Sequence, residues 1–246
     1  MLISKKSTAE LQDKLLKAKE TYCSGLFLSA RWVVVSNAAR QNLNLLVLPT
    51  MESAEYCSAD LYNLTEGDCV FFLPVSGKNV ERSNYKSSLG VQRTAAIGKI
   101  LENKADEKVF IVTYPEALEE LIPSEKNLTS AHLEIKAGDR VPYEELREKL
   151  VEKGFEKVDF VSAPGQYAIR GAVIDIFSYS LDKPYRISYF GNDVENIHTF
   201  DCNTQLSIDN VAKADIYSDI AAGGEEGGDS IIGLLPEDTT DRKSVG

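Results

Sequence analysis

The sequence predicts an α/β protein, in which a parallel α/β domain of the degenerate P-loop type is accompanied by an inserted small α+β domain with an antiparallel meander. The chain has 246 residues, 43% of them hydrophobic, which is enough for one large domain or two small ones. Its first half alternates short continuous apolar runs with helical patterns, as is typical of a parallel sheet covered on both faces. Its second half carries one helix and then consecutive strand patterns, which indicate a meander.

The first domain is expected at residues 1–125. A helix is predicted to begin at Ser7, because Ser7 and Glu10 form a capping box ahead of an apolar helical face. Continuous apolar runs predict buried strands at 43–49, 70–74 and 109–113. Helices are predicted between these strands, at 53–64 and 87–103. This order of elements places the first domain in the α/β class.

The second domain is expected at residues 126–212. A short amphipathic helix is predicted at 142–154, because Pro142 lies near its start and Gly154 near its end. Strands are predicted after it, at 158–161, 166–177, 185–190 and 194–200, with a tight turn at 191–193. Residues 213–246 are expected to begin as an acidic, glycine-rich linker.

Composition excludes several classes of function. Lysine and arginine number 27 and aspartate and glutamate 38, so the net charge is −11, which argues against a dedicated nucleic-acid binder. The sequence has no apolar run of about 18 residues and no secretory signal at its start, so we expect a cytoplasmic protein with no membrane partner. Four cysteines without a C-x-x-C pair and two histidines provide no zinc spacing, so no metal is expected.

The first strand-to-helix turn, where an α/β domain would bind phosphate, is degenerate. Against the pattern G-x-x-x-x-G-K-[ST], Gly25 fits, but Ala30 replaces the second glycine. Arg31 stands in place of the lysine, and Trp32 replaces the hydroxyl residue that would bind magnesium. We therefore expect no nucleotide or other cofactor at this turn and no enzymatic activity in this chain.

The meander carries the most specific pattern in the sequence. Residues 165–177 read G-Q-Y-A-I-R-G-A-V-I-D-I-F, residues 184–193 read P-Y-R-I-S-Y-F-G-N-D, and residues 199–205 read T-F-D-C-N-T-Q. This pattern resembles the UvrA-binding module that transcription-repair coupling factors (Mfd) share with the excision-repair protein UvrB. Arg93 and residues 112–118 also resemble the first domain of the coupling factors, and the missing Walker lysine favours the coupling factors over UvrB.

The resemblance implies a docking function without catalysis. In this family the second domain is inserted into the first, and residues 231–239 resemble the start of the segment that returns to the first domain. The implied role is to recruit UvrA for nucleotide excision repair where RNA polymerase has stalled. The family's contacts with RNA polymerase and its ATP-driven movement on DNA belong to regions outside this chain. Two alternatives stay open: a fragment of an ATP-dependent repair helicase of the UvrB type, and a DNA-binding repair domain.

The resemblance also implies a docking site. Arg170, Arg186 and Phe190 match the residues that contact UvrA in the family, and Glu195 lies in the family's acidic turn region, where it is expected to assist docking. Two arginines around an aromatic residue are a common composition for an interface hot spot. The alternative is a strand face with solvated arginines that bind no partner.

Strand periodicity supports the same site. Arg186 and Phe190 share one face of their strand, about 13 Å apart at ~3.3 Å per residue. If Phe177 pairs with Tyr185, even-numbered residues share that face and Arg170 lies beside Arg186. A bulge near residue 171 would break this arrangement. Asp175, within an apolar strand, is expected to form local hydrogen bonds.

Overall fold

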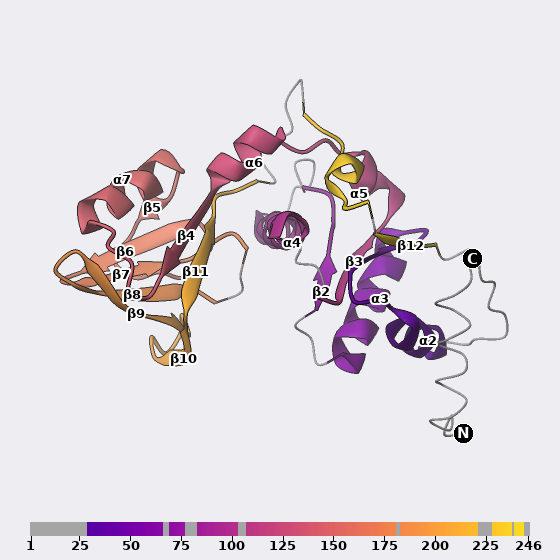
Figure 1. Ribbon diagram of the computed structural model, residues 1–246, viewed down its shortest axis with the longest axis horizontal. Coiled ribbons are helices and arrows are strands. Elements are labelled where there is room, and N and C mark those ends of the chain that lie inside the picture. The colour runs from indigo at the N-terminus through magenta and orange to yellow at the C-terminus, as the bar shows by residue number, and fades with distance from the viewer. Residues whose placement is uncertain are drawn as a thin grey trace. The chain divides into compact units, whose positions relative to one another are not determined.

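The computed structural model describes residues 29–65, 69–76, 83–102, 107–180, 183–220, 228–237 and 239–243 (Figure 1). The chain divides into two compact units. The first draws its described residues from Met1–Val75, Lys99–Glu120 and Ser230–Gly246, and the second from Ser76–Gly98 and Leu121–Asp229. The helix predicted to begin at Ser7, and Gly25 of the degenerate turn, lie outside the described residues.

The first unit is built on a parallel sheet with the strand order β12-β1-β3-β2. The strands are β1 (Leu43–Val47), β2 (Val70–Phe72), β3 (Val109–Thr113) and β12 (Thr240–Lys243). The helical elements are α2 (Ala30–Ala38), α3 (Met51–Leu64), α5 (Pro115–Glu119) and the 3-10 helix η2 (Ile231–Leu234), and α4 (Ser83–Glu102) ends in this unit. The predicted parallel α/β architecture is confirmed.

Burial and capping explain these elements. All five residues of β3 are buried, as its continuous apolar run predicts. Helix α3 begins at Met51 because the hydroxyls of Thr50 and Ser53 each accept a hydrogen bond from the other residue's backbone N–H. This reciprocal cap starts the helix two residues before its predicted start. No helix in the described ranges combines the length and apolar character needed to cross a lipid bilayer.

The second unit contains a six-stranded sheet with the order β10-β9-β8-β7-β6-β5. Its strands are β5 (Glu156–Lys157), β6 (Gln166–Arg170), β7 (Val173–Ile176), β8 (Tyr185–Phe190), β9 (Asp193–Phe200) and β10 (Ser207–Val211). Neighbours are antiparallel except β5 and β6. The unit also holds α6 (Glu125–Ala131), α7 (Tyr143–Glu152) and a separate antiparallel pair, β4 (His132–Lys136) and β11 (Lys213–Tyr217). The predicted meander and its preceding helix are confirmed.

The second unit differs from the predictions in several places, and β4 and β10 are strands that were not predicted. The single strand predicted at 166–177 is two strands, because Gly171 and Ala172 form a turn between β6 and β7, with φ of Gly171 at +60°. The strand predicted at 158–161 is absent from the described structure, and the short β5 precedes it. Residues 213–217, expected in the linker, form β11. The domain limits at 125 and 212 stay a prediction.

One face of the six-stranded sheet forms the core of the second unit. In β8 the alternation of buried and less buried residues places Tyr185, Ile187 and Tyr189 on this face. They pack with Leu146 and Leu150 of α7, and with apolar residues of β4 and β11. The opposite face, which we call the outer face, carries Arg186 and Ser188 of β8, and also a smaller apolar cluster that includes Ala168 of β6.

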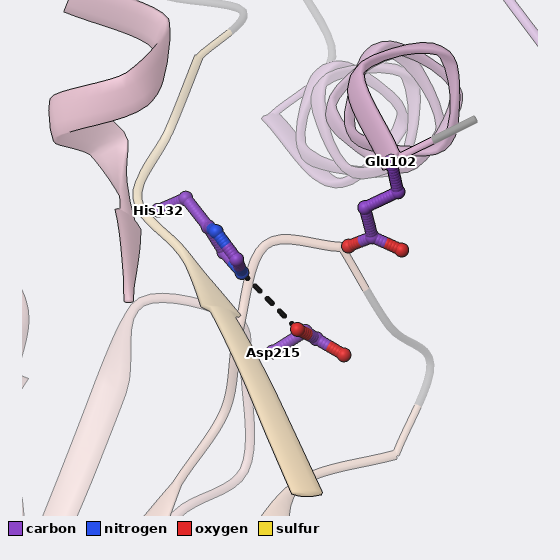
Figure 2. Close-up of side chains that lie close together, drawn as sticks. All are labelled: Glu102, His132 and Asp215. Carbon is purple, nitrogen blue, oxygen red and sulfur yellow. Dashed lines mark hydrogen bonds and ion pairs between the residues drawn. The ribbon is translucent and has the colours of Figure 1, made fainter. Parts of the chain in front are cut away.

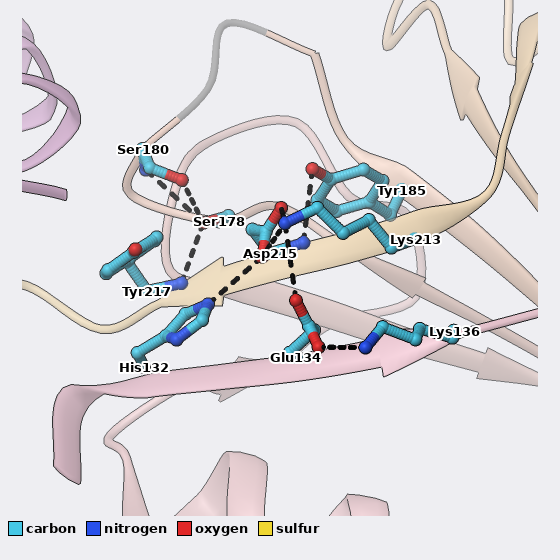
Figure 3. A network of polar contacts seen from close by, with 9 residues as sticks. All are labelled: His132, Glu134, Lys136, Ser178, Ser180, Tyr185, Lys213, Asp215 and Tyr217. Carbon is cyan, nitrogen blue, oxygen red and sulfur yellow. Dashed lines mark hydrogen bonds and ion pairs between the residues drawn. The ribbon is translucent and has the colours of Figure 1, made fainter. Parts of the chain in front are cut away.

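The β4–β11 pair is joined to the large sheet by side-chain hydrogen bonds (Figure 3). The N–H of Asp215 donates to the Tyr185 hydroxyl at 3.3 Å, and the N–H of Tyr217 donates to the Ser178 hydroxyl at 2.9 Å. His132 Nε2 lies 3.1 Å from a carboxylate oxygen of Asp215 (Figure 2), and its ring stacks on Tyr217 at 4.4 Å. The bonds to Tyr185 and Ser178 tie the pair to the buried side of the large sheet, and the His132 contacts join the two strands of the pair to each other.

Candidate docking site on the six-stranded sheet

The outer face of the sheet brings the two predicted arginines together. Its side chains come from alternate positions, which are Arg170 in β6, Asp175 in β7 and Arg186 in β8. Asp175 pairs directly with Arg186 across the two strands, and Arg170 lies on the next strand, opposite Val173. The three side chains therefore meet on one surface.

Asp175 holds both arginines. Its side chain is 1% exposed, and its two oxygens accept hydrogen bonds from Arg186 Nε at 2.8 Å and Arg186 Nη2 at 2.9 Å. Arg170 Nη2 donates to the same carboxylate. The two-pronged pairing is the strong geometry for arginine and carboxylate, and the hydrogen bonds that Arg186 donates to Asp175 raise the pKa of Arg186 above its ordinary value. The prediction that Asp175 forms local hydrogen bonds is confirmed.

Arg186 is also held from its other side. Its Nη1 donates to the backbone carbonyl of Gln205 at 2.9 Å, and its guanidinium lies 4.3 Å from the centre of the Phe200 ring. Gln205 has a φ of +59°, an uncommon conformation for a residue with a side chain. The turn before it is stabilised by Asp201, whose carboxylate accepts the N–H of Thr204 at 2.7 Å; this bond lowers the pKa of Asp201. Arg186 is consequently 18% exposed.

Arg170 is more open, because its side chain is 36% exposed. Its guanidinium lies 5.2 Å from the ring centre of Phe160, which is itself 62% exposed. These side chains border a shallow depression of about 390 Å³, which we call the arginine depression. It is lined by Phe160, Arg170, Val173, Arg186 and Gln205.

Phe190 and Glu195 lie beyond this depression. Phe190 ends β8 on the same strand face as Arg186 and is 79% exposed, beside a turn in which Gly191 has a φ of +64°. Glu195 is exposed in β9, where the register with β8 shifts between Ser188 and Tyr189. The structure therefore brings Arg170 and Arg186 into one cluster and places Phe190 farther along the strand.

The predicted pairing of the meander is wrong in two ways that cancel. Tyr185 pairs with Ile176 and not with Phe177, which moves odd-numbered residues of β7 to the outer face. The two-residue turn then pairs Arg170 with Val173, so β6 again presents even-numbered residues there. The arginines meet as predicted, although the path between them differs.

Phe160 is the site residue that sequence reasoning missed. The prediction placed it inside an ordinary strand at 158–161, whereas it lies in the segment before β6. The available sequence signal was alternation along the predicted strand, which places Phe160 on the face opposite Val161; in the structure Val161 is fully buried and Phe160 is exposed. Nothing in its local pattern links it to Arg170, which is ten residues later in the chain.

The degenerate turn is described from Ser29 onward. Ala30 opens α2, and the guanidinium of Arg31 lies 4.5 Å from the ring centre of Trp32. Trp32 is 4% exposed and packs in the core of the first unit. The position that would supply a magnesium-binding hydroxyl therefore holds a buried indole ring. Cys57 packs in the same core, where burial raises the pKa of its thiol to about 12.

Comparison with known proteins gives a family match over the region that contains the candidate docking site. Residues 133–220 match the family model described as the UvrB interaction domain. This range contains both arginines, Asp175, Phe160, Phe190 and the loop before β10. It covers the six-stranded sheet and most of its surrounding elements.

Similar curated proteins are transcription-repair-coupling factors. That of Bacillus subtilis (strain 168) is 30% identical over 201 residues, which are 80% of this chain and 17% of the relative. That of Haemophilus influenzae is 27% identical over 176 residues, 72% of this chain and 15% of the relative. A Staphylococcus aureus relative (strain USA300) is 27% identical over 199 residues, 80% of this chain and 17% of the relative. The chain thus spans less than a fifth of the length of these relatives, contains a UvrB interaction domain, and is homologous over 80% of its length to the N-terminal part of transcription-repair-coupling factors.

Proposed function

We propose that this chain is a docking module that recruits UvrA during transcription-coupled nucleotide excision repair, and that it binds UvrA through the outer face of the six-stranded sheet. The observation that carries the proposal is the cluster of Arg170, Asp175 and Arg186. Two guanidinium groups share one buried carboxylate, so the cluster keeps a net positive charge on an exposed face. A face of this kind fits a partner surface that presents carboxylates.

Phe190 supplies the apolar part of the proposed interface. A phenylalanine that is 79% exposed costs free energy in water, and burying it against a partner recovers this cost. Its place at the end of β8, on a hydrogen-bonded strand, fixes the position of its backbone before a partner arrives. Pre-positioned aromatic and arginine side chains are common hot spots, because little conformational freedom is lost on binding.

In this proposal the chain contributes recognition rather than catalysis. The buried Trp32 supports this reading, because an indole ring fills the place of the magnesium-binding residue. Contacts with RNA polymerase and ATP-driven movement along DNA are assigned to the remaining length of the relatives. Glu195, exposed on β9, is proposed to assist at the rim of the interface.

The proposal is tested by measuring the affinity of the purified chain for UvrA encoded in the same genome, by calorimetry or interferometry. Phe190→Ala is expected to weaken binding about tenfold or more. Val151→Ala is the matched control, because Val151 is also an exposed apolar residue, at 60%, but lies on α7. The absence of any complex, or equal affinities of Phe190→Ala and the parent, would contradict the proposal.

A further inference from the structure

The arginine depression contains an aromatic residue that the predicted docking site does not include. Phe160 forms one border of it, 62% exposed, with the Arg170 guanidinium 5.2 Å from its ring centre. Val173 adds a second apolar surface to the same depression. A pocket with a guanidinium group beside an aromatic ring offers two different kinds of contact within one side chain's reach.

The two arginines differ in how many of their guanidinium N–H groups donate hydrogen bonds within the described structure. A guanidinium carries five N–H groups. Three of those on Arg186 donate to Asp175 and to the Gln205 carbonyl. In the described part of the chain, one guanidinium N–H of Arg170 donates a hydrogen bond, to Asp175. Arg170 is also twice as exposed as Arg186, so it has the greater capacity to bind a partner group.

We infer that Phe160 is a second aromatic docking residue, and that the arginine depression accepts an acidic side chain of the docking partner. The carboxylate of this side chain binds Arg170, and its aliphatic part packs on Phe160 and Val173. This inference rests on the proposed docking function and adds to it the residue that shapes the depression and the chemistry of its occupant.

Charge and hydrogen-bonding capacity decide the class of occupant. A basic side chain would be repelled by two guanidinium groups that share one carboxylate. An apolar side chain would remove water from the N–H groups of Arg170 without replacing their hydrogen bonds, which is costly. An acidic side chain complements both parts of the depression, because its carboxylate pairs with Arg170 and its methylene groups pack on the Phe160 ring.

The test compares single and double variants in the UvrA binding assay. Phe160→Ala is expected to weaken binding about fivefold, and Val151→Ala less than about twofold. Since Phe160 is exposed, both variants are expected to melt at the parent's temperature. Phe160→Ala combined with Arg170→Ala is expected to lose less affinity than the product of the two single losses, because both residues hold the same side chain.

The outcomes separate this inference from the proposed function. If Phe190→Ala weakens binding and Phe160→Ala does not, the docking function stands and the role of Phe160 is overturned. If the losses of Phe160→Ala and Arg170→Ala multiply, the two residues do not share an occupant, and the acidic side chain in the depression is overturned. If the parent chain forms no complex with UvrA, the proposed function itself fails.

Discussion

Asp175 and Arg186 face each other across β7 and β8, and the carboxylate of one accepts two hydrogen bonds, of 2.8 and 2.9 Å, from the guanidinium of the other. Asp175 is almost completely buried, whereas the outer edge of Arg186 reaches solvent. Arg186 is therefore part of the internal framework as well as part of the surface. Phe190, by contrast, projects from the end of the same strand. The two residues should respond differently to truncation.

Arg186→Ala is expected to lower the free energy of unfolding by about 2 kcal/mol, because it leaves the buried carboxylate of Asp175 with Arg170 as its remaining arginine partner. The loss is smaller than for a fully buried pair, since Arg186 is partly solvated. Urea denaturation monitored by circular dichroism measures it. An unchanged denaturation midpoint would show that water fully replaces the hydrogen bonds that Asp175 loses with Arg186.

Phe190→Ala is the matching surface variant. Because its ring is 79% exposed, its removal is expected to change the free energy of unfolding by less than about 0.5 kcal/mol. The same denaturation experiment measures this change. A marked loss of stability would mean that the ring packs against the sheet in solution. Phe190→Ala would then no longer separate an effect on binding from an effect on folding.

Asp175→Asn is expected to weaken UvrA binding about fivefold, although Asp175 is too buried to contact a partner. The amide cannot neutralise either arginine or accept the paired hydrogen bonds, so Arg170 and Arg186 repel each other and lose their fixed positions. Affinity is measured at a temperature where the variant is fully folded. The NMR signal of Arg186 Nε–H is expected to shift upfield as its hydrogen bond is lost. Retained affinity despite this shift would show that Asp175 does not position the site.

Tyr189→Phe is expected to make unfolding less sensitive to alkaline pH. Burial raises the pKa of Tyr189 to about 12 from the ordinary value of 10.0. Its neutral form therefore stabilises the fold fully below pH 10, and this contribution is lost as the pH rises toward 12. The Tyr189 hydroxyl has no hydrogen-bond partner among the described residues, so the variant is expected to equal or exceed the parent's stability at pH 7, by up to about 1 kcal/mol. Denaturation at pH 7, 10 and 11 measures both effects. The prediction is contradicted if the variant's free energy of unfolding falls between pH 10 and 11 as much as that of the parent.

Magnesium and ATP are expected to leave the melting temperature of the chain unchanged. The reason is the buried Trp32 at the position where a nucleotide-binding turn needs a hydroxyl. Differential scanning fluorimetry with millimolar Mg-ATP checks this expectation, with a working P-loop protein as a positive control. A clear upward shift would restore the ATPase alternative, because ligand binding to the folded state raises its stability.

Local patterns predicted much of the fold. Apolar runs located β1 and β3, which lie inside the parallel sheet and are almost entirely buried, and also β2, a partly buried strand at its edge. The β4–β11 pair was missed, because its two strands are far apart in the chain and their pairing depends on tertiary contacts. Its position is set by hydrogen bonds to Tyr185 and Ser178, which have no local sequence signal.

The docking site was predictable in composition but not in geometry. The arginines and Phe190 could be named from the motif, and strand periodicity placed Arg186 and Phe190 on one face. The role of Asp175 as the shared partner of both arginines depends on a register one residue away from the predicted one. The position of Phe160 depends on the loop before β6, in which Val161 packs against Ala168, Phe177 and Phe200; these are tertiary contacts that have no local sequence signal.

The two-residue turn at Gly171 and Ala172 restricts how this surface can evolve. Side chains alternate between core and outer face on both sides of the turn, so one inserted or deleted residue that shifted the register of β6 would exchange its two faces. Arg170 would then enter the apolar interior, and Tyr167 would become exposed. Changes of hairpin length by one residue are therefore expected to be disfavoured here. Partner preference can diversify instead by replacing single outward-facing side chains, with the scaffold beneath them left intact.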